Sequence, residues 1–592
     1  MNQLIRRLAV LMLAFVLLLS LVACGENDSP QKSGTETATG STGEDSQQNG
    51  TETSPQNNSP TQTESAYNGL FDDTVVHTVD VIISEEDWAD LLANPLEKTK
   101  YKASVVIDGE TLEEVSFATK GNTSLSSVAS DPNSDRYSFK LNFGKYKKGQ
   151  SYHGLDKLNL NNLYADATCL KDWLSYRIFR QAGVDAPLTS YVWLRVNGQD
   201  QGLYLAIEEI GESWLDRTQE GEGMLYKPET EEQNPPEGSP GNGEDPGNFQ
   251  GNPPEGFPSN GESQSGFPGN PPAGFPGNEE GQGGFHGSMG FGGNAKGADL
   301  KYTGDDSADY SDIFDNHETD MDEGAEVRVI TALKALSEGK ADQALDTEEV
   351  ICYFAAHNFV LNYDSYTGTM LHNYYLYEND GKLSMLPWDY NLAFGGFGGM
   401  GEGMPNPGNT GSSGKTPDPG RRSNSGEMPS PGGMGKGMPY FGEMGGSDAT
   451  SLVNTGMDTP LSGATEDSRP MWSWIAADEA YLDRYHAVYD KLLSSYFENG
   501  SFEAELDRMA ALLRPYVEKD PTAFYSLEEF NSGVKTLRQF CLLRAESIRK
   551  QLDGTLATRT EDQNQADKVD ASQVEIRSMG SMAGERNTGR RQ

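Results

Sequence analysis

Cysteine is scarce in this sequence, with four residues in a chain of 592. A disulfide-stabilised scaffold needs a dense set of cysteines, so that class of secreted domain is excluded. Cys169, Cys352 and Cys541 lie far apart in apolar stretches, and we predict that all three are buried free thiols.

Basic residues are also few, because 46 Lys and Arg stand against 90 Asp and Glu, for a formal net charge of −44. Such an excess of negative charge repels nucleic acid, and we predict no nucleic-acid partner. The same charge favours solubility and attraction to basic polypeptides. An anionic ligand would have to be held by a local basic patch or by a metal ion.

Hydrophobic residues make up only 35% of the chain, while glycine and proline number 67 and 30, so much of it cannot bury a core. Two segments, 231–300 and 395–446, concentrate glycine and proline. In the first segment, a proline-rich sequence motif that starts at Asn234 recurs at Asn252 and Asn270, with a period of 18 residues. We predict that both segments are long disordered inserts, with weak contacts through Phe and Met as an alternative role.

Long apolar runs are absent except at the amino terminus. Leu8 to Val22 follows two arginines and leads into Leu21-Val22-Ala23-Cys24. This pattern is typical of a bacterial lipoprotein signal peptide, in which Cys24 becomes the lipidated first residue. A transmembrane anchor is the alternative, but the run is short for the roughly 20 residues that a span needs. We therefore predict an extracytoplasmic protein that is lipid-anchored to the cell membrane or to a spore envelope.

These features divide the chain into folded and unfolded parts. The predicted parts are a signal peptide (1–23), a disordered tether (24–66), a β-rich lobe (67–230), an insert (231–300), a helical lobe with the candidate motifs (301–394), a second insert (395–446), further helices (447–552) and a disordered tail (553–592).

The patterning of the folded parts predicts an α+β fold. Alternating β-branched and apolar residues predict strands and two hairpins, over 101–119 and 191–207. A helical stripe over 167–182 follows Asp166, which is placed to cap it. The later parts are mostly helical around a hairpin over 373–388. A β-rich lobe joined to a helical lobe suggests a kinase-like layout with long disordered inserts.

Several residues of the β-rich lobe are candidates for binding a nucleotide. Lys120 and Asn122 lie in a short turn after a strand, where backbone amides can hold phosphate, although an ordinary surface turn would look the same. Lys140 alternates with apolar residues and can point into a cleft. Glu208 and Glu209 end a strand, where one carboxylate could pair with that lysine or both could face solvent.

Two acids of the helical lobe are candidates for phosphate chemistry. Asp364 and Asp389 lie on either side of the predicted hairpin, which returns the chain close to its start. Two carboxylates with the amide oxygen of Asn373 suit Mg²⁺ or Mn²⁺. His372 could also be a ligand, but a packed histidine is the preferred interpretation.

At these residues the chain resembles the spore-coat protein kinase H (CotH) family of atypical kinases. The matching stretches are TKGNTS, RYSFKLNF, GLDKLNLNNLYADATCLKDWLSYRIFRQAGV, YVWLRVNGQDQGLYLAIEEI, GMLYKPE, NFVLNYDSY, HNYYLYENDGKLSMLPWDYNLAFGG and FCLLRAESIRK. The resemblance extends over about 67–552 apart from the inserts. One departure is Lys120-Gly121-Asn122, where Arg-Gly-Asn is common in the family.

The resemblance implies a two-lobed kinase-like fold and phosphorylation of protein serines that depends on ATP and on Mg²⁺ or Mn²⁺. It implies that Asp364 is the catalytic residue and Asp389 the metal ligand. Lys140 with Glu208 or Glu209 is a weaker assignment for the Lys–Glu pair of a kinase. The expected substrates are basic, serine-containing coat or envelope proteins. The alternatives are an inactive kinase-like scaffold or adhesive module of the envelope, and a sugar-binding surface module.

Overall fold

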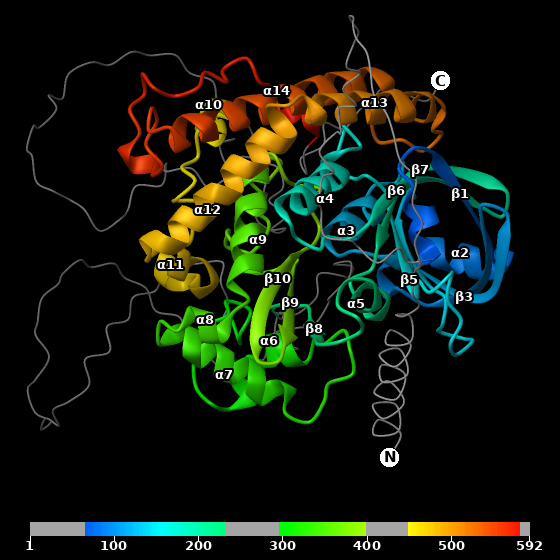
Figure 1. The fold of residues 1–592 in the computed structure, drawn as a ribbon. Coiled ribbons are helices and arrows are strands. Elements are labelled where there is room, and N and C mark those ends of the chain that lie inside the picture. Colours follow the sequence, from blue (N-terminus) through cyan, green and yellow to red (C-terminus); the bar gives the residue numbers. More distant parts are fainter. Residues whose placement is uncertain (1–65, 231–294, 398–447, 581–592) are drawn as a thin grey trace, which may run out of the picture. The chain divides into compact units, whose positions relative to one another are not determined.

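The computed structural model describes residues 66–230, 295–397 and 448–580 (Figure 1). The predicted signal peptide, Cys24, nearly all of the tether and most of both inserts lie outside these ranges. The described residues belong to one compact unit. Of the three cysteines in that unit, Cys352 and Cys541 are buried, Cys169 is half-buried, and all three are free thiols.

The first part of the unit is a closed β-barrel. Its strands are β1 (Val76–Ile82), β2 (Tyr101–Ile107), β3 (Glu110–Lys120), β4 (Ser138–Asn142), β5 (Lys157–Asn161), β6 (Thr189–Val196) and β7 (Gln199–Glu208). They pair in the order β1-β2-β3-β4-β5-β7-β6, and a parallel pairing of β1 with β6 closes the circle. Both hairpins predicted here are confirmed, whereas the closure was not foreseen.

The interior of the barrel is filled by the apolar residues that alternate along each strand. Phe117 stacks on Phe139 with ring centroids 4.6 Å apart, and Phe139 lies 6.2 Å from Tyr204. These rings belong to a hydrophobic cluster of their own. Side chains of alternate residues therefore pack inside and leave the ends of the strands to carry polar groups.

Four helices accompany the barrel strands: α2 (Glu85–Ala93), α3 (Thr123–Ala129), α4 (Lys171–Ala182) and α5 (Glu212–Thr218). Ser84 caps α2, because its hydroxyl accepts the Asp87 amide at 3.0 Å. Helix α4 begins four residues later than expected. Leu170 and not Asp166 is its N-cap residue, although the Asp166 carboxylate still accepts the amides of Thr168 and Lys171, each at 2.9 Å.

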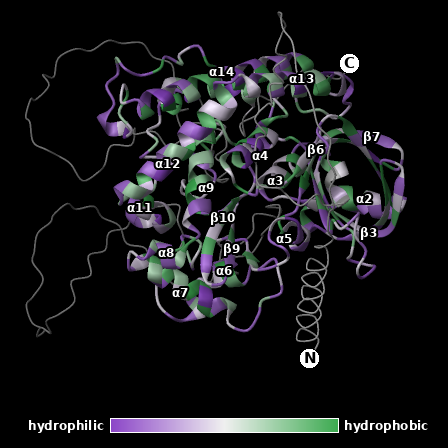
Figure 2. Ribbon diagram, viewed as in Figure 1, coloured by the Kyte–Doolittle hydropathy of each residue, from purple (hydrophilic) through white to green (hydrophobic). Residues whose placement is uncertain are grey.

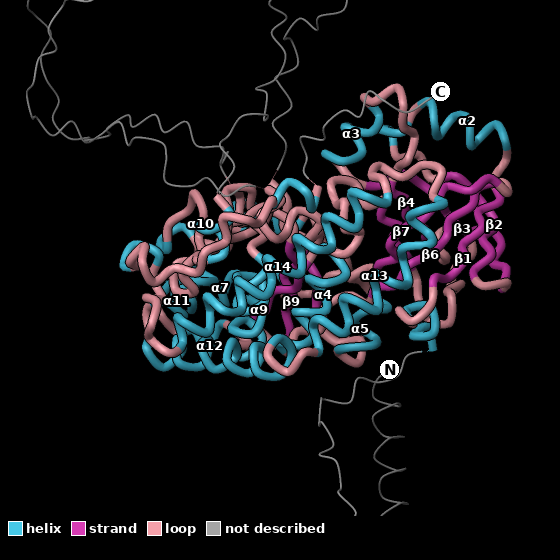
Figure 3. The backbone as a smooth tube through the Cα atoms, turned by 90° about the horizontal axis from the view of Figure 1, so that it is seen from above, coloured by secondary structure: helices cyan, strands magenta, loops and turns pink. Residues whose placement is uncertain are grey.

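A second, three-stranded sheet lies outside the barrel, and Figure 3 shows the two sheets as separate groups of strands. It consists of β8 (Met224–Tyr226), β9 (Tyr374–Asn379) and β10 (Lys382–Pro387), with β9 in the centre. The predicted hairpin is confirmed as β9–β10. Strand β8 precedes the first predicted insert and β9 and β10 follow it, so this sheet connects the parts of the chain on the two sides of the insert.

Helices make up most of the regular secondary structure in the remaining described residues. They are α6 (Ser311–Phe314), α7 (Ala325–Ser337), α8 (Ala341–Ala344), α9 (Thr347–Val360), α10 (Ala449–Val453), α11 (Pro470–Ala476), α12 (Glu479–Leu492), α13 (Ser501–Lys519) and α14 (Leu527–Leu552). Helix α9 is buried along nearly its whole length. Helix α14 alternates hydrophobic and hydrophilic residues and buries one side (Figure 2). No helix among the described residues has the length and apolarity to cross a bilayer.

Two predicted boundaries are wrong. Residues 553–580 do not form a disordered tail: Val569, Val574 and Met579 are buried against the helical core, and a 3₁₀ turn over Ile576–Met579 packs on α14. Their apolar residues are too sparse and irregular to give a periodic signal. The first insert also ends earlier than residue 300, because Leu300 is fully buried.

The α+β class is confirmed. Its two hydrophobic clusters, one inside the barrel and one uniting α4 with the second sheet and the later helices, lie within a single compact unit. A kinase-like relation between the two parts stays a prediction.

Candidate active site

The barrel contributes a Lys–Glu ion pair in which the glutamate is buried and the lysine half-buried. Lys140 of β4 lies with its Nζ 2.7 Å from the Oε1 of Glu209, directly after β7. Asn159, opposite Lys140 on β5, donates its amide to the other oxygen of Glu209. Burial acts to raise the pKa of Glu209, but Lys140 and these hydrogen bonds more than offset it and lower the pKa to about 2. Glu209 is therefore a firmly ionised partner for the lysine.

Glu208 pairs with a different cation, Arg217. The prediction that Glu208 could pair with Lys140 is therefore wrong, and Glu209 is the partner of Lys140. The Glu208 carboxylate accepts two hydrogen bonds from the Arg217 guanidinium, at 2.8 and 2.7 Å, and one from the Tyr67 hydroxyl. Consecutive residues of a strand point to opposite sides, so only one of the two glutamates can face Lys140.

Lys120 is a second cation on the same side of the barrel. It ends β3, donates to the Asn161 Oδ1 at 2.8 Å, and lies over the ring of Trp388 at 5.4 Å. In the described part of the chain no carboxylate lies within ion-pair distance of Lys120. Burial lowers the pKa of Lys120 to about 8, although the charges of Asp389 and Glu209 oppose this. Lys120 is thus a half-buried cation without a carboxylate partner.

Asn122 is not part of this cluster in the structure. It is exposed at the start of the short helix α3, and its side-chain oxygen accepts from Lys98 Nζ at 2.6 Å.

Asp364 follows α9 in a short turn and is held on both carboxylate oxygens. The Nε2 of His372 lies 2.7 Å from Oδ1, and the amide of Asn373 donates to Oδ2 at 3.1 Å. Burial lowers the pKa of His372, but the hydrogen bond and charge of Asp364 more than offset it, so the pKa is raised. The packed histidine that the sequence favours at position 372 is in fact a hydrogen-bond partner of Asp364, and its position eight residues beyond Asp364 is the signal that points to this contact.

Asp389 lies two residues after the end of β10 and has a backbone φ of 54°, in the left-handed region. Among the described residues no group donates a hydrogen bond to its carboxylate. Burial raises the pKa of Asp389 and the Asp364 charge adds to this, while Lys120 opposes it. Two neighbouring carboxylates, one of them without donors, form a site that a cation would stabilise.

The structure adds residues that the sequence did not single out. Asp172 of α4 is buried and accepts the amide of Tyr390 at 2.7 Å, and Asn362 donates its side-chain amide to the Asp389 carbonyl at 3.1 Å. Both act on the backbone of the Asp389 turn. The Asp172 contact joins residues 218 positions apart and leaves no local signal in the sequence, whereas Asn362 lies 27 residues before Asp389 and reaches it only because the intervening chain folds back.

The carboxylates of Asp389 and Asp364 fit a divalent metal ion that takes its remaining ligands from phosphate and water. Within the described ranges, no set of three or more His, Cys, Asp or Glu side chains forms a metal site by itself. Asp389 offers free carboxylate oxygens, and Mg²⁺ is commonly bound by one or two carboxylates together with phosphate oxygens and water. The amide nitrogen of Asn373 contacts Asp364, so Asn373 supports that residue.

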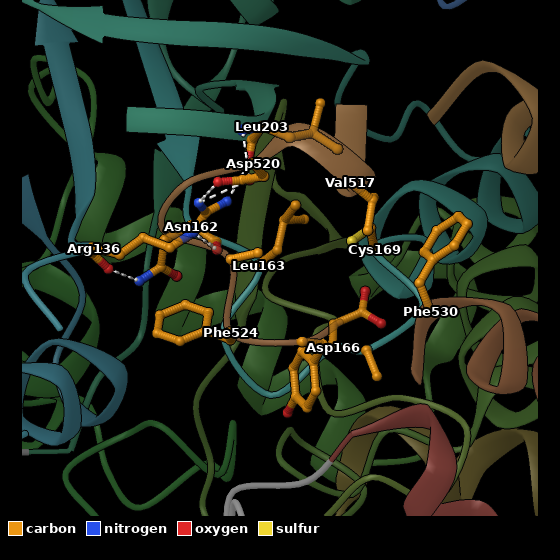
Figure 4. Close-up of a pocket in the computed structure, with 13 residues that line it drawn as sticks. Arg136, Asn162, Leu163, Asp166, Cys169, Leu203, Val517, Asp520, Phe524 and Phe530 are labelled. Carbon is orange, nitrogen blue, oxygen red and sulfur yellow. Dashed lines mark hydrogen bonds and ion pairs between the residues drawn. The ribbon is translucent and has the colours of Figure 1, made fainter. Parts of the chain in front are cut away.

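A separate cavity lies between the barrel and the α13–α14 connection (Figure 4). Arg136 and Asp520 form an ion pair at 3.0 Å across it, and Phe524 and Cys169 line it. None of the predicted site residues lines this cavity. It belongs to the joint between the barrel and the helices.

Residues 117–548 match the family model described as CotH kinase protein. The chain belongs to the CotH kinase family. The match extends from β3 to α14 and includes Lys120, Lys140, Glu209, Asp364 and Asp389. Strands β1 and β2 and residues after 548 lie outside it.

One curated relative within this family is the inner spore coat protein H of Bacillus subtilis (strain 168). The two sequences are 25% identical over 77 residues, which is 13% of this chain and 21% of the relative. The match therefore spans about a fifth of that CotH protein's length.

Proposed function

We propose that this CotH family member is an ATP-dependent protein serine kinase. The proposal is carried by one observation: a lysine paired with a buried glutamate lies in the same cluster as an unpaired lysine and two carboxylates, of which Asp389 has no hydrogen-bond donor in the described part of the chain. A Lys–Glu pair facing a metal-binding acid is the arrangement by which kinases hold and activate nucleotide phosphates.

On the barrel side, Lys140 would contact the nucleotide phosphates while Glu209 fixes its position. Lys120 would place a second positive charge beside the transferred phosphate, because it lies near Asp389 and has no carboxylate partner among the residues that the structure describes. Both cations would stabilise the negative charge of the phosphoryl group in the transition state. This division of roles corresponds to a kinase-like fold in which the barrel acts as the nucleotide-binding part.

On the helical side, Asp389 would hold Mg²⁺ or Mn²⁺, which supplies charge neutralisation at the phosphate oxygens. Asp364 would orient the serine hydroxyl and accept its proton. His372 and Asn373 hold the two oxygens of Asp364 in place, so the carboxylate is oriented before substrate arrives.

The cellular location and the substrates form part of the same proposal. A lipidated Cys24 would tether the kinase outside the cytoplasm, at the cell membrane or a spore envelope. A relative named for the inner spore coat supports envelope or coat proteins as substrates. The net charge of −44 favours basic, serine-containing ones by electrostatic steering.

The test separates binding from transfer. Calorimetry with ATP and Mg²⁺ or Mn²⁺ measures binding, and phosphate transfer is measured on a Lys/Arg-rich serine peptide. Asp389→Asn should weaken metal-dependent nucleotide binding and turnover together. Asp364→Asn should leave binding intact and lower turnover by roughly 10²-fold or more, the usual scale of acid–base help.

A matched control is Asp458→Asn, because Asp458 also pairs with a histidine, His486, at 2.8 Å but lies outside the cluster. This variant should keep both activities. Normal phosphate transfer by both site variants would mean that the site assignment is wrong. If the wild-type protein binds no nucleotide with either metal, the kinase proposal fails and the inactive kinase-like scaffold takes its place.

A further inference from the structure

The turn that carries Asp389 adopts a conformation that the residue does not favour by itself. A φ of 54° places Asp389 in the left-handed region, where a side chain with a Cβ atom is strained. Such a conformation persists only when surrounding contacts hold the backbone. The carboxylate can therefore point into the cluster only while something secures the turn.

Two consecutive amides of this turn are secured by one helix. The Asp389 amide donates to the Tyr176 hydroxyl at 3.1 Å, and the Tyr390 amide donates to the Asp172 Oδ1 at 2.7 Å. Asp172 and Tyr176 are four residues apart in α4, so they lie on the same helix face. Both side chains are buried.

Packing supports the same contact. The Tyr390 ring meets Tyr176 edge-on with centroids 6.0 Å apart, and meets Phe179 at 5.1 Å. The start of α4 is fixed as well, because the Asp166 carboxylate accepts the Lys171 amide and the buried Lys171 ammonium donates to the Ala165 carbonyl at 3.0 Å. The helix thus offers a fixed edge against which the turn rests.

We propose that Asp172 and Tyr176 are positioning residues, which act through the backbone of Asp389 to present its carboxylate to the metal and nucleotide. The inference rests on the proposed function for its catalytic consequence. The mechanical part, that α4 secures the turn, stands apart from that function and has its own measurement.

The Asp172 carboxylate acts here as a hydrogen-bond acceptor, which suggests a graded set of variants. Asp172→Asn retains an acceptor oxygen for the Tyr390 amide, whereas Asp172→Ala removes it. Tyr176→Phe removes the hydroxyl and keeps the ring packing. Tyr191→Phe is the matched control, because it also removes a buried tyrosine hydroxyl, one that donates to the Cys169 carbonyl away from this turn.

The first measurement is amide hydrogen exchange of the full chain over residues 386–392. Exchange should become faster by about tenfold in Asp172→Ala and by a few fold in Tyr176→Phe, and should stay near wild type in Asp172→Asn and Tyr191→Phe. The second is nucleotide affinity with Mn²⁺, which should fall by about tenfold in Asp172→Ala and be largely retained in Asp172→Asn.

Unchanged exchange in both Asp172→Ala and Tyr176→Phe would overturn the proposal. So would faster exchange with unaltered nucleotide affinity, because the helix would then be only structural. If the wild-type protein binds no nucleotide, the proposed function fails, and the exchange of the four variants still decides whether α4 secures the turn.

Discussion

Glu208 and Glu209 illustrate how neighbouring residues of identical chemistry acquire different roles. One side of β7 faces Arg217 and Tyr67, and the other faces Lys140 and Asn159. Both carboxylates are buried and both are fully provided with donors. The Glu208 pair joins α5 to the barrel, while the Glu209 pair holds Lys140, whose side chain is only half-buried.

The Glu209 pair makes a pH-dependent contribution to stability. The pKa of the Glu209 carboxyl is about 2 in the folded chain, against an ordinary value of 4.5 for glutamate, so folding favours the charged form. The contribution, on the order of 3 kcal/mol, is fully present above about pH 4.5 and is lost as the pH falls towards 2. We expect Glu209→Gln to lower the free energy of unfolding at pH 7, with a difference from wild type that shrinks over that pH window in denaturant titrations.

Glu114→Gln is the matched control, because Glu114 pairs with Lys102 at 3.0 Å on the same barrel with both side chains about half exposed. An exposed pair contributes little, so this variant should change stability by less than about 1 kcal/mol. A pH-independent loss in Glu209→Gln would show that the lost charge is not the cause.

At the scale of elements, one buried arginine joins the barrel to the helices. Arg136, just before β4, pairs with Asp520 at 3.0 Å and donates to the carbonyl of Asn162 (Figure 4). Its guanidinium also lies 4.7 Å from the ring centroid of Tyr204. Gly202 permits this approach: at its φ of +99°, a Cβ atom would come within 2.0 Å of the Asp520 carboxylate. The α13–α14 connection thereby rests on the barrel edge.

Removal of Arg136 should be strongly destabilising. Arg136→Met leaves Asp520 as a buried carboxylate without its cation, and loss of one partner of a buried pair costs about 3–5 kcal/mol. The measurement is the free energy of unfolding from denaturant titration. Arg508→Met is the control, because this α13 arginine also binds the barrel side, through Asp73, but is 39% exposed. Equal losses in the two variants would contradict a special role for the buried pair.

At the scale of the whole molecule, residues 553–580 close the helical part. The Asn454 side chain bonds both the amide and the carbonyl of Val569, and the Gly580 carbonyl accepts from the buried Lys171 ammonium at 3.3 Å. The segment therefore reaches from α10 to the start of α4, next to the residues that secure the Asp389 turn.

A chain that ends at residue 552 should be less stable than one that ends at 580. It loses the burial of Val569, Val574 and Met579, at about 1.5–3 kcal/mol for each fully buried side chain of this kind. The comparison is the melting temperature of the two truncated chains, and the chain ending at 580 serves as the control because it retains every described contact of the segment. Equal melting temperatures would mean that residues 553–580 pack without stabilising the fold.

Local pattern was enough to determine much of the architecture. The hairpins β2–β3, β6–β7 and β9–β10 follow from periodicity and turn residues, which act within a few residues of the chain. The approach of Asp364 to Asp389 was also foreseeable, because a hairpin brings its ends together. The resemblance to the CotH family came from the same short stretches and is confirmed.

Only the tertiary structure decided which of these residues meet. Closure of the barrel through β1 and β6, the choice of Glu209 over Glu208, and the contact of Asp172 with the Tyr390 amide each join residues separated by long stretches of chain. Sequence pattern states which residues share a face, but not what that face meets. The partner is fixed by packing between elements, where the burial of a charge or an amide admits only the arrangement that satisfies it.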